Sequence, residues 1–134
     1  FLKVVVMIRV LIVEDESLIA DGIRRIAIRL GYEASAIVSS GEEALEQVLA
    51  NPPQLILMDV ALFGSMDGLH TARRIREQCP APIIFITAYA NTRVLSQIAL
   101  GKPSGYQGYI VKPFSEDELR RTMAAALAAA EHST

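Results

Sequence analysis

Short apolar runs alternate along the chain with longer stretches in which apolar residues recur every third or fourth position. Short runs rich in β-branched residues are typical of buried strands, and the longer period is typical of amphipathic helices. The runs predict strands at residues 10–13, 33–38, 55–58, 83–86 and 109–111. The stretches that follow them predict helices at residues 17–30, 41–50, 68–78 and 91–100, with a last helix from 116 into the alanine-rich tail.

Polar side chains mark the expected beginnings of three of these helices. Ser40 is suited to cap the second helix, and either Asp67 or Gly68 opens the third. Ser115 precedes the last helix and Glu118 follows three residues later, which is the spacing of a capping box. These residues predict helix starts independently of the apolar pattern.

Five strands that alternate with five helices predict an α/β fold. Parallel strands need long crossover connections, and right-handed crossovers place the helices on both faces of the sheet. We therefore expect a doubly wound, five-stranded parallel sheet. In sheets of this kind the functional crevice lies at the carboxyl ends of the strands.

The composition fits one domain and excludes several classes of protein. The chain has 134 residues, 51% of them apolar, and 13 Lys and Arg balance 15 Asp and Glu, so charge gives no support to direct nucleic-acid binding. The only cysteine, Cys79, precludes an internal disulfide, which favours the cytoplasm. Residues 1–10 are apolar, but Lys3 and Arg9 interrupt them, so we expect neither a membrane anchor nor a secretory signal. If Met7 is the natural start, residues 1–6 are an N-terminal extension.

Residues suited to one kind of chemistry follow four of the predicted strands. They are Glu14, Asp15 and Glu16, then Asp59, then Thr87, and last Lys112. Carboxylates held close together repel one another, and a divalent cation with hard oxygen ligands, most simply Mg²⁺, relieves that repulsion. The Lys ammonium and the Thr hydroxyl could bind an anionic oxygen. Together these groups suit phosphoryl transfer to a carboxylate, with Asp59 as the nucleophile.

Four motifs in order carry a family resemblance. They are VLIVEDE at 10–16, LILMDVALFGSMDG at 55–68, IIFITAYA at 83–90 and GYIVKPFSEDEL at 108–119. With these motifs the chain resembles the phosphoacceptor receiver domain of two-component response regulators, of the chemotaxis-regulator type. The resemblance implies a receiver domain over residues 7–132 and a flavodoxin-like sheet with strand order 2-1-3-4-5.

The resemblance also implies roles for the acidic residues. Asp59 is the expected phosphoacceptor. Glu14, Asp15 and Asp59 are the expected carboxylate ligands of Mg²⁺, and Ala61 is expected to give a backbone carbonyl to the same ion.

Further roles fall at the ends of the fourth and fifth strands. Thr87 and Lys112 are expected to bind the phosphoryl oxygens, and Pro113 is expected to follow a cis peptide bond. Tyr109 is the expected switch residue, whose ring turns inward when Thr87 moves to the phosphoryl group.

Each role has a plainer alternative that the sequence leaves open. Asp59 could cap a loop, Thr87 could be an ordinary strand-end hydroxyl, and Lys112 could be a surface lysine. Tyr109 could be a simple core aromatic. Glu16 is expected to be a solvated charge and is left out of the site.

The chain also departs from the common family pattern in two places. The loop after Asp59 is slightly longer, and the segment before Lys112 is longer by a few residues and contains Gly-Tyr twice. Distance from Lys112 favours Tyr109 as the switch. Tyr106 is expected in the loop that precedes the fifth strand.

The leading functional hypothesis is a signalling switch. A sensor histidine kinase or a phosphotransfer protein would donate the phosphoryl group. The face formed by the fourth helix, fifth strand and fifth helix would then bind an unknown protein target or support a homodimer. No membrane or direct nucleic-acid partner is expected, and the only activity expected is self-phosphorylation and self-dephosphorylation.

Two alternatives belong to other classes of protein. A phosphatase with an aspartyl nucleophile shares much of this chemistry, but it usually carries a second Asp two residues later, where this chain has Ala61. The chain could also be the receiver part of a longer regulator whose output domain is not present, because its tail shows no basic helix-turn-helix pattern.

Overall fold

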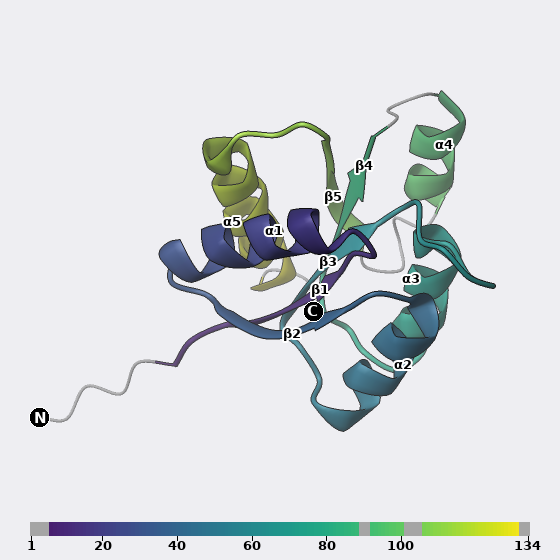
Figure 1. Ribbon diagram of the computed structural model, residues 1–134, viewed down its shortest axis with the longest axis horizontal. Coiled ribbons are helices and arrows are strands. Elements are labelled where there is room, and N and C mark those ends of the chain that lie inside the picture. Colours follow the sequence, from purple (N-terminus) through teal and green to yellow (C-terminus); the bar gives the residue numbers. More distant parts are fainter. Residues whose placement is uncertain (1–5, 89–91, 101–105, 132–134) are drawn as a thin grey trace, which may run out of the picture.

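Strands and helices alternate throughout the part of the chain that the computed structural model describes, namely residues 6–88, 92–100 and 106–131 (Figure 1). In chain order they are β1 (Arg9–Val13), α1 (Ser17–Arg29), β2 (Glu33–Val38), α2 (Gly41–Ala50), β3 (Leu55–Asp59), α3 (Gly68–Arg76), β4 (Ile83–Thr87), α4 (Thr92–Leu100), β5 (Tyr106–Val111) and α5 (Glu116–Glu131).

The five strands form one sheet in the order β2-β1-β3-β4-β5, and every neighbouring pair is parallel. This is the flavodoxin-like order that the family resemblance implies. Because β1 and β3 are neighbours, the residues that follow β1 lie beside the end of β3. The order of the strands therefore brings the acidic residues after β1 next to Asp59.

Helices cover both faces of the sheet, as Figure 1 shows. Successive side chains of a strand point to opposite faces, so each strand feeds two separate apolar clusters. Leu11, Ile56 and Phe85 join the cluster beneath α2, α3 and α4, while Ile12 and Leu57 join the cluster beneath α1 and α5. Every residue of β3 and β4 is buried, which explains why these two strands read as continuous apolar runs.

The helix starts agree with the polar signals in the sequence. The side chains of Ser40 and Asp67 cap α2 and α3, because each accepts a hydrogen bond from the backbone N–H three residues later, at 3.1 and 2.8 Å. Ser115 and Glu118 bond reciprocally at 3.1 and 3.3 Å, which confirms the capping box.

The start of β5 differs from the expectation. The strand was expected at 109–111 with Tyr106 in the preceding loop, but it begins at Tyr106, which pairs with Ile83. A register shift next to this pair places Gly108 opposite Ile84. Pairing with β4 extends the strand beyond the apolar run, and local pattern carries no sign of such pairing.

Several expectations fall outside the described residues. Asn91, expected to begin the fourth helix, lies outside them. So do residues 101–105, which belong to the segment before Lys112 that is expected to be longer than usual. The expected extension at 1–6 is described only at Val6. Among the described residues, no helix combines the length and apolar character needed to cross a bilayer.

Candidate functional site

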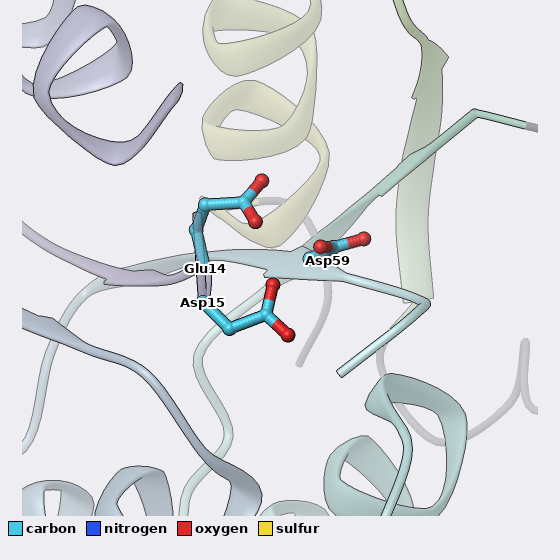
Figure 2. A group of neighbouring side chains, drawn as sticks. All are labelled: Glu14, Asp15 and Asp59. Carbon is cyan, nitrogen blue, oxygen red and sulfur yellow. The ribbon is translucent and has the colours of Figure 1, made fainter. Parts of the chain in front are cut away.

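Three carboxylates meet at the carboxyl ends of β1 and β3. Asp59 is the last residue of β3, and Glu14 and Asp15 follow the last residue of β1 directly. Each offers an oxygen within 4.8 Å of the others. In Figure 2 the carboxyl groups of Glu14 and Asp15 face the side on which Asp59 lies. Glu14 and Asp59 are only 2% and 3% exposed, whereas Asp15 is half-buried.

Backbone N–H groups orient these carboxylates. Oδ1 of Asp59 accepts a 3.0 Å hydrogen bond from Ala61 N–H, and Oδ2 of Asp15 accepts one of 3.1 Å from Phe63 N–H. Oε2 of Glu14 accepts a third, also of 3.1 Å, from the backbone two residues later. The loop after Asp59 is therefore bonded to the phosphoacceptor candidate and to a metal-ligand candidate at the same time.

Lys112 brings a positive charge to the carboxylates. Its Nζ donates a 2.8 Å hydrogen bond to Oε1 of Glu14 and lies 3.6 Å from Oδ2 of Asp59. The backbone N–H of Lys112 also bonds the carbonyl of Thr87 at 2.8 Å, which places the ends of β4 and β5 side by side. Thr87 is buried, and the peptide bond between Lys112 and Pro113 is cis. Lys112 is thus not an ordinary surface lysine.

Burial and neighbouring charges shift the pKa values of Asp59 and Glu14 in opposite directions. Burial, reinforced by the hydrogen bond with Glu14, raises the pKa of Asp59 to about 7. Burial also opposes ionisation of Glu14, but hydrogen bonds from Lys112, Asp59 and its own loop lower the pKa of Glu14 below its ordinary value. Glu14 is therefore the charged partner of Lys112, and Asp59 is close to its titration point at neutral pH.

The cluster fits a hard divalent cation. Its donors are carboxylate oxygens only, which Mg²⁺ prefers, and the half-buried Asp15 leaves one side open to the waters that Mg²⁺ retains. Burial, together with the neighbouring Glu14, raises the pKa of Asp59, and a bound cation would favour its ionised form. Glu14, Asp15 and Asp59 are the residues that would hold it.

Three further residues from the sequence analysis have defined places in the structure. Ala61 is in the loop directly after β3, and its expected carbonyl contact with the ion stays a prediction. Tyr109 is 41% exposed and lies opposite Phe85, so the alternative of a buried core aromatic is wrong. Glu16 is exposed, in agreement with its omission from the site.

Gly68, the first residue of α3, supports the site but was not identified from the sequence pattern as part of it. A Cβ at this position would lie 2.0 Å from the carbonyl oxygen of Asp59 and 2.9 Å from Cα of Val60. Gly68 N–H also bonds the Val60 carbonyl at 2.9 Å. The Asp-Gly pair at 67–68 was the available signal, since glycine often marks a close approach of two backbone segments.

Comparison with known proteins agrees with this geometry. The response regulator receiver domain pattern matches residues 10–124. The transcriptional regulatory protein YvrH of Bacillus subtilis is 40% identical over 111 residues, which are 82% of this chain and 45% of YvrH. The chain spans about half the length of the curated relatives it matches.

Two solved structures are similar over nearly the whole chain. The signal receiver domain of a modulated diguanylate cyclase from Desulfovibrio desulfuricans is 32% identical, with a TM-score of 0.86, and the match covers 96% of this chain and 100% of that one. A CheY-like receiver domain protein from Methanospirillum hungatei is 25% identical, with a TM-score of 0.83 and the same coverage of both chains.

Proposed function

The chain belongs to the response regulator receiver domain family of two-component systems, and we propose that it is a phosphorylation switch whose acceptor is Asp59. One observation carries the proposal. Asp59 is a buried carboxylate at the end of β3 with Lys112 Nζ 3.6 Å away and two further carboxylates close by. Few plain structural roles would gather three acidic groups at one end of a sheet.

Transfer to Asp59 needs its carboxylate ionised and a phosphoryl donor in line with one of its oxygens. An Asp59 oxygen forms a bond to phosphorus while the bond between phosphorus and the donor, a phosphohistidine nitrogen, breaks. Lys112 neutralises charge on the transferred oxygens, and the Thr87 hydroxyl donates to one of them. Mg²⁺ held by Glu14, Asp15 and Asp59 would supply further positive charge for the same oxygens.

The donor is a histidine kinase or a phosphotransfer protein. Two large apolar side chains close to the acidic cluster support a protein rather than a small molecule as the natural donor. Leu18, in the first turn of α1, is 89% exposed, and Phe63, in the loop after β3, is 79% exposed. Apolar side chains left this open next to a charged centre are typical of an interaction surface.

The output surface is the face formed by α4, β5 and α5. Tyr109 holds its ring partly in solvent there, beside an open pocket of about 510 Å³ that Arg121 and Thr122 of α5 also line. Inward rotation of the ring, once Thr87 has moved to the phosphoryl group, would change this surface. Its partner is a protein target or a second copy of the chain.

The protein is a switch rather than an enzyme with a separate substrate. Water hydrolyses the acyl phosphate slowly, so self-phosphorylation and self-dephosphorylation are its only reactions. We assign the switch to the cytoplasm. The transcriptional regulator YvrH is about twice as long as the matched region, which favours a second proposal, that the receiver controls an output domain in a longer protein.

A small phosphodonor tests the acceptor directly. Acetyl phosphate with Mg²⁺ is expected to raise the intact mass by one phosphoryl group, and EDTA is expected to prevent the change. Asp59→Asn should abolish the mass change, whereas the exposed neighbour Glu16→Gln should label like the parent. Equal labelling of Asp59→Asn and the parent would disprove the assignment.

A further inference from the structure

Helix α2 and the loop that follows Asp59 are in direct contact at Gly41, the first residue of the helix. Gly41 is buried, and a Cβ on it would lie 2.2 Å from Oγ1 of Thr71 and 3.2 Å from Cβ of Met66. Real side chains do not tolerate a contact of 2.2 Å, so the backbone of α2 lies as close to α3 as a residue without a side chain allows. Figure 1 shows α2 and α3 side by side on the same face of the sheet.

The residue that Gly41 touches is tied to the loop. Thr71 is fully buried, and its Oγ1 donates a 2.7 Å hydrogen bond to the carbonyl oxygen of Asp67. Met66, the other contact of Gly41, is the residue before Asp67 and is 7% exposed. The contacts of Gly41 with Thr71 and Met66 therefore constrain the part of the loop that leads into α3.

A second contact holds the outer part of the loop. The Ser65 hydroxyl donates a hydrogen bond to Oε1 of Glu42, the residue after Gly41. Gly64 lies between Phe63 and Ser65, and its φ of +107° is in the left-handed region that favours glycine. The first turn of α2 thus contacts the loop at Ser65, Met66 and, through Thr71, Asp67.

The other half of the same loop carries the metal site. Ala61 N–H bonds Asp59 and Phe63 N–H bonds Asp15, so a displacement of the loop would move two carboxylates and the Ala61 carbonyl together. We propose that the first turn of α2, through Gly41 and Glu42, is a positioning element for the metal site. It holds the loop where the Asp15 and Asp59 carboxylates and the Ala61 carbonyl can bind one Mg²⁺ ion. This inference rests on the proposed function for the identity of the ion.

Gly41→Ala tests the main contact. The added methyl is expected to displace Met66 and Thr71 and to weaken Mg²⁺ binding, measured by calorimetric titration, about tenfold, as is common when a residue that orients a metal ligand is changed. In the metal-free protein, the amide NMR signals of Ala61 and Phe63 should shift as well. Gly22→Ala is the matched control, because a Cβ on this exposed helical glycine has no atom within 4 Å. It should bind Mg²⁺ like the parent.

A second substitution distinguishes positioning from general damage. Gly41→Ala with Thr71→Ala removes the atom 2.2 Å from the new methyl, and the nearest remaining contacts are at 3.2 Å. The double variant should bind Mg²⁺ more tightly than Gly41→Ala does. Its Mg²⁺ affinity and its Ala61 and Phe63 signals should match those of Thr71→Ala alone. A general loss of stability would not be rescued in this way. Unchanged Mg²⁺ affinity in Gly41→Ala would overturn the inference, and so would a double variant no better than Gly41→Ala.

The exposed hydrogen bond between Ser65 and Glu42 provides a second test in case Gly41→Ala does not fold. Ser65→Ala removes the exposed bond to Glu42 and should weaken Mg²⁺ binding and shift the Phe63 signal. If neither changes, the inference is wrong. Failure of the proposed function has a different signature, namely a parent protein that binds Mg²⁺ but takes no phosphoryl group from acetyl phosphate.

Discussion

The Lys112 ammonium donates a 2.8 Å hydrogen bond to the Glu14 carboxylate, from a position 98 residues later in the chain. The side chain of Glu14 is 1% exposed and that of Lys112 is 17% exposed, so this is a buried ion pair rather than a surface one. A buried charge needs a partner, and Lys112 is the partner of Glu14 in this structure. The same ammonium is 3.6 Å from Asp59, so a Mg²⁺ ion bound to this cluster would compete with Lys112 for the same carboxylates.

Lys112→Met is therefore expected to separate metal binding from phosphorylation. Without the competing ammonium, Mg²⁺ should bind at least as tightly as to the parent. The rate of phosphorylation by acetyl phosphate should fall at least about tenfold, or about 1.4 kcal/mol of barrier, because a cation is lost from the transferred oxygens. Calorimetric titration and the rate of mass change measure the two effects. Parallel loss of Mg²⁺ affinity and rate would contradict a role for Lys112 in transfer.

The raised pKa of Asp59 predicts an unusual pH dependence of stability in EDTA. The pKa is 3.8 for an ordinary Asp and about 7 in the folded protein, so between these values the folded protein binds the additional proton. Stability contributed by this group is full below the unfolded pKa and is lost as pH rises toward 7. Glu14, whose pKa is lowered in the folded protein, contributes stability that is lost as pH falls. That loss occurs only in more acidic solution.

Asp59→Asn should remove this loss of stability at rising pH, because the amide side chain does not ionise. We expect the variant to exceed the parent in free energy of unfolding by about 2 kcal/mol near pH 8, with a much smaller difference near pH 5. Urea denaturation in EDTA at the two pH values measures this. The same difference between variant and parent at both pH values would show that Asp59 does not titrate in this range.

Mg²⁺ should stabilise the folded protein through the acidic cluster. At a Mg²⁺ concentration ten times the dissociation constant, mass action adds about 1.4 kcal/mol to the free energy of unfolding. Asp15→Asn keeps an oxygen that can accept from Phe63 N–H but removes the charge, so most of this gain should disappear. Thermal melts with MgCl₂, against NaCl of equal ionic strength, provide the measurement. A full Mg²⁺ gain in Asp15→Asn would exclude Asp15 as a ligand.

Gly68→Ala should destabilise the protein by about 3 kcal/mol, because the new methyl would meet the Asp59 backbone, which cannot move aside as a flexible side chain could. Gly22→Ala adds the same methyl in open space in α1 and is expected to be neutral or to stabilise by up to about 1 kcal/mol. Chemical denaturation of both variants compares them directly. Equal stabilities would mean that α3 can retreat from Asp59 without cost.

Local patterns in the sequence were enough to predict most elements of the fold. The positions of the strands and helices were predictable because hydrophobic period and capping chemistry act over a few neighbouring residues, as at Ser40, Asp67 and Ser115. The convergence of Glu14, Asp15, Asp59 and Lys112 was also predictable, since all follow strands of a parallel sheet whose carboxyl ends share one edge.

The sequence by itself therefore determined the elements, the α/β class and the acidic centre, whereas the tertiary structure decided which atoms are partners. The start of β5 at Tyr106 depends on pairing with Ile83, and the lysine bond goes to Glu14 first and Asp59 second. The contact of Gly41 with Thr71 joins two helices whose patterns are complete without it. The physical reason is common to all three. Each depends on distances between residues far apart in the chain, and only the packing of the whole sheet and its helices sets those distances.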